Sequence, residues 1–179
     1  MKNRESTLIN FYAGGGSDNR GRMLREIHRW SDEELERTHD YIQWLFPLTE
    51  RSAFNMHAPI LDAKVIQEFR GRPELHENLR ASFVRMLAFL GFRLLTDEPL
   101  RVVPAADFVE QAQNWLTPGN HNHLRITRIL KSLRILGLEE EATALFRCLE
   151  GLHGKESRAP RPRISEETFS YWRSAVGAD

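Results

Sequence analysis

The 179-residue chain has the length of one globular domain, and 41% hydrophobic with 28% charged residues is ordinary for a folded protein. Its 25 basic residues equal its 25 acidic residues, so no net charge steers it toward nucleic acid or anionic lipid. Its single cysteine, Cys148, excludes an intrachain disulfide and indicates a reducing compartment. The sequence shows neither a signal peptide nor the roughly twenty apolar residues of a membrane span. We therefore expect a cytoplasmic protein without a transmembrane segment.

Helical spacing begins near the start of the chain. The stretch AGGGSDNRG, residues 13–21, interrupts it, and we interpret this stretch as a flexible connector. Further on, Ser31 and Glu34 form the pattern of a capping box. Apolar residues then recur at helical spacing up to a proline, which predicts one continuous helix from Ser31 to Pro47.

Caps and breakers divide the rest of the chain. The further elements that they predict are helices over residues 22–30, 62–71, 73–91 and 108–116, a short strand pair within 93–104, two helices that meet near Gly137, and a last helix capped by Ser165. The expected fold is all-α, a single globular domain of about seven to eight helices with room for one short strand pair. We expect a helical domain over residues 1–154, a basic, proline-containing linker over 155–164, and a C-terminal helix, 165–179, packed on the same domain.

The predicted helix 31–47 carries a histidine and several aromatic residues. At about 100° per residue, His39 falls on the apolar face, whereas Asp40 points away from it, so the two cannot act together as a dyad. A histidine in that position is either a hydrogen-bonded core residue or a ligand contact. Tyr41 and Trp44 need polar partners if they are buried. They therefore fit either core packing or the border of a pocket.

The tripeptide His121–His123, HNH, does not indicate a nuclease, because it precedes a helix and no other ligand stands at a metal-site spacing. We expect no metal there and interpret Asn122 as a helix N-cap. In the following helix, Arg125, Arg128, Lys131 and Arg134 recur every three residues on the half opposite the leucines and isoleucines. Such a fan suits an anion or phosphate, including RNA or a nucleotide, but also a solvated face neutralised by Glu139–Glu141. Those same carboxylates disfavour a DNA-reading helix.

Two segments resemble a known family. LERTHDYIQWLFPL and NHLRITRILKSLRILGLEEEA are similar to the two signature blocks of the opioid growth factor receptor conserved region. Supporting similarities include NFY near the start, Trp30 before the capping box and LGFRL at the end of the long helix. The resemblance extends from roughly residue 9 to residue 150, in the same order.

The resemblance implies an all-helical region found in vertebrate receptors for the pentapeptide Met-enkephalin and in smaller microbial proteins. Vertebrate members are associated with the nuclear envelope and the cytoplasm, which implies peripheral membrane association at most. They also carry a nuclear-localisation region and repeats after this region, whereas the present chain ends soon after it. We therefore expect a bacterial, single-domain member, without nuclear import or growth signalling. The family supplies no catalytic or ligand residues that could be carried over.

We expect a receptor-like, non-enzymatic module that recognises a peptide or small ligand and needs no cofactor. The expected contacts are His39, Tyr41 and Trp44 in an aromatic pocket, with Asn122, Arg125 and Arg128 as polar contacts. One alternative is an RNA-, nucleotide- or phosphate-binding protein that uses the helix Arg125–Arg134. A second is an enzyme of unrecognised class, although no nucleophile elbow, zinc-protease pair or dinucleotide motif is present. The sequence leaves the ligand and the oligomeric state open.

Overall fold

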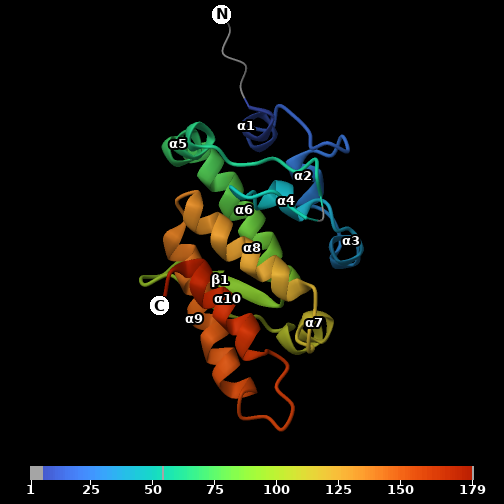
Figure 1. Ribbon diagram of the computed structural model, residues 1–179, viewed down its shortest axis with the longest axis vertical. Helices are drawn as coiled ribbons and strands as arrows, with labels where there is room; N and C mark the ends of the chain where they lie inside the picture. The colour runs from blue at the N-terminus through green and yellow to red at the C-terminus, as the bar shows by residue number, and fades with distance from the viewer. Residues whose placement is uncertain (1–5, 54, 179) are drawn as a thin grey trace, which may run out of the picture. The chain divides into compact units, whose positions relative to one another are not determined.

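A computed structural model of the chain (Figure 1) describes residues 6–53 and 55–178. This part of the chain contains ten helices and one two-stranded antiparallel sheet, which confirms the largely helical fold class with its strand pair. The chain divides into two compact units. Unit 1 comprises Met1–Arg85 and Ile135–Gly137, and unit 2 comprises Met86–Arg134 and Leu138–Asp179. No helix of the described residues has the length and apolarity needed to cross a membrane.

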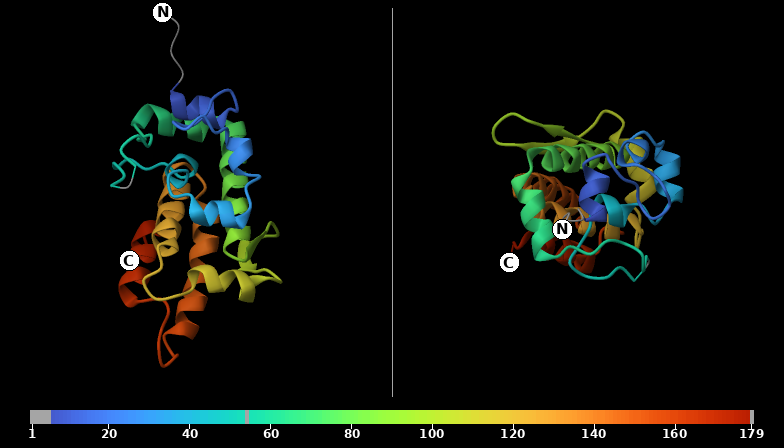
Figure 2. Two further views of the ribbon diagram at one scale, coloured as in Figure 1. Left: turned by 90° about the vertical axis from the view of Figure 1, so that its right-hand side faces the viewer. Right: turned by 90° about the horizontal axis from the view of Figure 1, so that it is seen from above.

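Unit 1 consists of short helices and one long one. They are α1 (Thr7–Tyr12), α2 (Leu24–Ile27), α3 (Asp32–Arg37), α4 (Ile42–Leu45), α5 (Ala63–Gly71) and most of α6 (Pro73–Phe89). Figures 1 and 2 show α6, in green, as the longest of them, with α5 at its start. The predicted starts of α5 and α6 are confirmed: Asp62 Oδ1 accepts a hydrogen bond from the Val65 backbone N–H at 2.8 Å, and α6 begins at Pro73.

Tyr12 connects the first helix of unit 1 to three others. Its hydroxyl donates to the backbone carbonyl of Leu45 in α4, and its own carbonyl accepts from Asn78 Nδ2 in α6 at 2.7 Å. Its ring meets the Phe69 ring of α5 edge to face, with 4.8 Å between centroids. These contacts satisfy the polar groups of a residue that is fully buried, and they fix α4 at the base of the site described below.

The prediction of one continuous helix from Ser31 to Pro47 is wrong. The capping box is present, since Ser31 Oγ accepts from the Glu34 backbone N–H at 3.2 Å and the Glu34 carboxylate accepts from the Ser31 N–H at 2.9 Å. However, α3 ends at Arg37, Thr38 is extended with φ −96° and ψ 130°, and α4 begins only at Ile42. The break places His39 in an exposed position between the two helices, not on an apolar helix face.

Unit 2 contains the sheet and the remaining helices. The strands β1 (Phe92–Leu95) and β2 (Arg101–Pro104) pair in antiparallel register, with Phe92 opposite Pro104 and Leu95 opposite Arg101. The helices are α7 (Phe108–Trp115), α8 (Asn122–Ile135), α9 (Glu139–Glu156) and α10 (Glu166–Val176). Strand β2 and helix α10 both contact α9, and Figures 1 and 2 show α9 and α10, in orange and red, side by side.

Two tryptophans organise the core of unit 2. Trp115 Nε1 donates to the Leu90 carbonyl at 3.0 Å, and Trp172 Nε1 donates to the His123 carbonyl at 3.2 Å. The His123 ring lies edge-on to both indoles, at centroid distances of 6.2 and 5.7 Å. Each buried indole N–H therefore has an acceptor, as its low exposure requires.

Helix ends in unit 2 follow most of the predicted signals. Ser165 caps α10, because its Oγ accepts from the Thr168 N–H at 3.1 Å. Asn122, however, is not the N-cap: it is the first residue of α8, and its N–H donates to Asn120 Oδ1 at 2.9 Å. The end of α9 is fixed by Glu156, whose carboxylate accepts two hydrogen bonds from the Arg163 guanidinium at 2.8 and 2.5 Å.

Candidate ligand site

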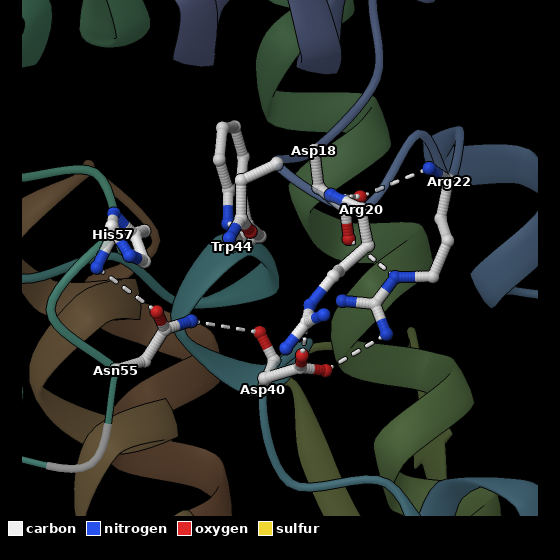
Figure 3. A network of polar contacts seen from close by, with 8 residues as sticks. Asp18, Arg20, Arg22, Asp40, Trp44, Asn55 and His57 are labelled. Carbon is white, nitrogen blue, oxygen red and sulfur yellow. Dashed lines mark hydrogen bonds and ion pairs between the residues drawn. The ribbon is translucent and has the colours of Figure 1, made fainter.

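Asp40, in the break between α3 and α4, lies at the centre of a polar network in unit 1 (Figure 3). Its Oδ1 accepts from Arg22 Nη1 at 2.8 Å, and its Oδ2 accepts from Arg20 Nε at 3.1 Å. Its backbone carbonyl accepts from Asn55 Nδ2 at 3.2 Å. These bonds explain why the helix stops here: Asp40 is held by side chains from distant parts of the sequence instead of by a helical ladder.

Asp18 anchors the other end of the same network. One carboxylate oxygen accepts from the backbone N–H groups of Arg20 and Arg22 at 2.8 and 2.9 Å, and the other accepts from Arg22 Nε at 2.6 Å. The Asp18 side chain is fully buried, and this loop is therefore held in place. The stretch 13–21 was predicted to be a flexible connector, and for its second half that prediction is wrong.

The arginines control the ionisation of Asp40. Partial burial by itself raises the pKa of this carboxyl, but the hydrogen bonds and charges of Arg22 and Arg20 outweigh burial and hold the pKa below its usual value. Arg22 also lies over the Trp30 ring, with its Cζ 5.4 Å from the ring centroid. Asp40 is therefore an ionised, charge-paired group and not a proton donor near neutral pH.

Two open hollows border this network and share Asn19 and His57. The polar hollow, of about 520 Å³, is lined by Asn19, Arg20, Asp40, Asn55, Met56 and His57. The second hollow, of about 510 Å³, has a mixed lining, and we call it the apolar hollow because of Leu8, Trp44, Pro59, Ile60 and Val65. Its polar lining residues are Ser6, Thr7, Asp18, Asn19, His57 and Asp62. Because Asn19 and His57 line both, the two hollows adjoin on the surface of unit 1, and we call them together the paired hollow.

Asn19, which lines both hollows, is held by a hydrogen bond from the Trp44 indole. Trp44 Nε1 donates to Asn19 Oδ1 at 2.9 Å, and the Trp44 ring packs edge to face on Phe11 at 5.3 Å. Trp44 itself is 3% exposed, so it supports the surface more than it covers it. Ile60 and Met56 present the exposed apolar side chains, at 41% and 83% exposure.

The structure separates the site residues that the sequence suggested. Of His39, Tyr41 and Trp44, only Trp44 lines the paired hollow. Tyr41 is fully buried, and its ring meets that of Trp30 edge to face at 5.5 Å. His39 is exposed in the break between the helices.

Asn122, Arg125 and Arg128 all belong to α8 in unit 2. Asn122 is 0% and Arg125 is 6% exposed, and Arg125 Nη1 donates to Asn122 Oδ1 at 3.1 Å. The Arg125 guanidinium also lies 6.0 Å from the centroid of the Phe89 ring. Arg128 and Lys131 are half-buried, and Arg134 is exposed. The four cations therefore do not form the open fan that their spacing predicted.

The sequence did not predict most residues of the paired hollow. Asp40 was set aside once His39 and Asp40 were excluded as a dyad, although the structure makes it the centre of the network. An aspartate two residues before an arginine, in a glycine-flanked stretch, is a signal for a side-chain-capped turn. The partnership of that turn with Asp40 had no local signal at all.

Comparison with known proteins identifies the class. A family model described as the opioid growth factor receptor (OGFr) conserved region matches residues 2–178. The largely helical chain therefore belongs to the opioid growth factor receptor family, which confirms the resemblance of the two signature blocks.

Several relatives have this family's name. The rat opioid growth factor receptor (Rattus norvegicus) is 42% identical over 159 residues, which cover 87% of this chain and 27% of that protein. The human protein is 38% identical, over 84% of this chain and 22% of its own length. The mouse opioid growth factor receptor-like protein 1 is 36% identical, over 82% of this chain and 31% of its own length. The chain thus spans about a quarter of the length of these relatives. No solved structure matches it.

Proposed function

We propose that this chain is a receptor-type binding module, not an enzyme, and that it recognises a peptide or another small ligand in the paired hollow of unit 1. The observation that carries the proposal is the chemistry of that surface. It combines the exposed apolar side chains of Met56 and Ile60 with two polar groups, the Nη groups of Arg20 and the imidazole of His57. These two groups make no hydrogen bond to a described residue. Apolar surface bordered by a few directed polar groups is typical of small-ligand sites.

The relatives support the same class of function. They are named opioid growth factor receptors, and Trp44 of α4, which lines the apolar hollow, lies within the first signature block. Asp62 lines the apolar hollow and Arg20 the polar hollow, so charged groups of both signs border the surface. A short peptide with free ends carries both charges and apolar side chains, and it fits such a surface.

The two alternative functions have less support in the described residues. A phosphate- or RNA-binding face on α8 would need exposed cations, and Arg125 is 6% exposed. For an enzyme, a serine–histidine contact is present between Ser82 Oγ and His28 Nε2, at 2.8 Å. Ser82 is 0% exposed, so a substrate could not reach its oxygen.

Calorimetric titration with Met-enkephalin, the pentapeptide that the family resemblance implies, tests the proposal. We expect saturable binding that weakens about tenfold in Ile60→Ser, because an apolar contact of the hollow is lost. Val84→Ser on α6 is the matched control, since Val84 is 44% exposed and lines neither hollow. Equal affinities of the two variants, or no binding to the unmodified chain, would contradict the proposal.

A further inference from the structure

The polar hollow presents hydrogen-bond donors that the described part of the chain does not use. Asn19 accepts from Trp44 through Oδ1, which leaves both N–H groups of its Nδ2 without a bond to a described residue. The His57 imidazole makes no such bond either, because its only bond is from the backbone N–H to Asn55 Oδ1 at 3.1 Å. Of its guanidinium nitrogens, Arg20 uses only Nε, which donates to Asp40. Donors from three residues therefore border one concave surface.

Asp40 fixes the direction of the Arg20 guanidinium. The bond from Nε to Asp40 Oδ2, seen in Figure 3, leaves the two Nη groups of a 67%-exposed side chain available. Asp40 is itself held by Arg22 Nη1 and by Asn55. A guanidinium oriented in this way loses less rotamer entropy on binding, and its parallel N–H groups match the two oxygens of a carboxylate.

We propose that the polar hollow is the carboxylate subsite of the paired hollow, and that it binds the C-terminal carboxylate of a ligand peptide through Arg20, with Asn19 and His57 as further contacts. The inference rests on the proposed function and names the part of the ligand that this end of the site recognises. The hollows share Asn19 and His57, so the last side chain of the peptide would enter the apolar hollow while its carboxylate meets Arg20.

The charge balance favours a carboxylate over a phosphate. The network holds two cations, Arg20 and Arg22, and two carboxylates, Asp18 and Asp40, so their formal charges cancel. A dianion would face the neighbouring Asp40 without excess positive charge to offset it. A planar monoanion needs only the two free Nη groups of Arg20.

NMR titration with small probes tests this subsite without the whole peptide. The probes are N-acetyl-leucine, its C-terminal amide and inorganic phosphate, and the signals are those of the Arg20 Nε–H and the Trp44 indole N–H. We expect N-acetyl-leucine to shift both signals and to bind at least about tenfold more tightly than the amide, since a charge-assisted bidentate contact is lost in the amide. Phosphate should bind more weakly than N-acetyl-leucine.

Two variants complete the test. Arg20→Gln should remove the preference for the acid over the amide, whereas Arg37→Gln should keep it, because Arg37 is 71% exposed on α3 and lines neither hollow. Equal affinity for acid and amide, tighter binding of phosphate, or an unchanged preference in Arg20→Gln would overturn the inference. If the pentapeptide binds while acid and amide are equivalent, the carboxylate subsite fails and the proposed function stands. If the pentapeptide does not bind while the acid is preferred through Arg20, recognition of the pentapeptide fails and the carboxylate contact of the polar hollow stands.

Discussion

Arg22 donates to Asp40 at 2.8 Å across 18 residues of sequence, and this contact interrupts what would otherwise be one helix. The same guanidinium donates to the buried Asp18 at 2.6 Å, so it joins the loop before α2 to the break before α4. The paired hollow lies beside this junction. Its shape therefore depends on the Asp18–Arg22–Asp40 network.

Loss of the Asp40 charge should destabilise unit 1. In Asp40→Asn, the side chain keeps its size, but Arg22, which is 19% exposed, loses an ionised acceptor. We expect the free energy of unfolding to fall by about 1–3 kcal/mol in urea denaturation. Glu33→Gln is the control, because the Glu33–Arg37 ion pair is long, at 3.9 Å, and exposed. Its loss should leave the free energy of unfolding unchanged. Equal stability of the two variants would mean that the network does not hold the loop.

Two glycine substitutions should change stability in opposite directions. Gly91 has φ +79°, and an added Cβ would lie 2.8 Å from Phe108 Cα, so Gly91→Ala should cost about 1–3 kcal/mol. Gly154 lies inside α9, and apart from its chain neighbours and the backbone of α9 itself no atom lies within 4 Å of an added Cβ, so Gly154→Ala should stabilise by about 0.5–1 kcal/mol. Thermal unfolding of both variants measures this. A loss of stability in Gly154→Ala would contradict the account of α9.

Stability should fall as the pH is lowered below neutrality. Ser82 Oγ donates to the Asn78 carbonyl at 3.1 Å, so it accepts from the neutral His28 ring at 2.8 Å. Burial, with a smaller contribution from the Arg85 charge, lowers the pKa of His28. Burial likewise lowers the pKa of His123, slightly assisted by the charge of His121 and opposed by a backbone hydrogen bond.

The unfolded chain therefore binds more protons than the folded chain just below the ordinary histidine pKa of about 6.5. The contribution of the two neutral histidines to the free energy of unfolding is complete above that pH. It is lost as the pH falls toward the lowered pKa values of the folded chain. We expect the free energy of unfolding to be smaller at about pH 5 than at about pH 8, with a shallower slope in His28→Gln. A flat profile, or one that rises on acidification, would refute the assignment of His28 as a neutral buried group.

Cys148 should react slowly with thiol reagents. Burial raises the pKa of its thiol to about 11 from an ordinary value of 9.0, although Lys155 acts weakly in the opposite direction. Two pKa units lower the thiolate fraction about 100-fold near neutral pH, and the rate of disulfide exchange follows the thiolate. A less acidic thiolate is intrinsically more nucleophilic, which offsets about half of this effect on a logarithmic scale. Labelling of the native chain with an aromatic disulfide reagent should therefore be at least about tenfold slower than labelling in urea. Similar rates in both states would show a reactive cysteine.

Local signals predicted the helix ends well. Ser31, Asp62 and Ser165 cap helices as their side chains and spacing indicated, and Gly91 ends α6 with a positive φ. The strand pair within 93–104 also formed as expected. Each of these features depends on residues within a few positions of one another, and such local interactions can be predicted from the sequence.

Tertiary contacts account for the failures. Asp40 is hydrogen-bonded to Arg20, Arg22 and Asn55, which stand 15 to 20 residues away in the sequence. The spacing of apolar and polar residues does not predict such distant partners. Arg125 lies on the polar half of its helical wheel, yet it is buried against Asn122 and above the Phe89 ring. Spacing gives the face on which a cation lies, but it does not give what covers that face.

The central claim is that the ligand enters the paired hollow of unit 1, and NMR mapping of the bound pentapeptide tests it most directly. We predict that addition of Met-enkephalin shifts the Trp44 indole signal and the amides of Asn19, His57 and Ile60, while the amide of Arg128 on α8 stays unchanged. Shifts confined to α8, or no shifts at a peptide concentration that saturates the calorimetric signal, would contradict the account.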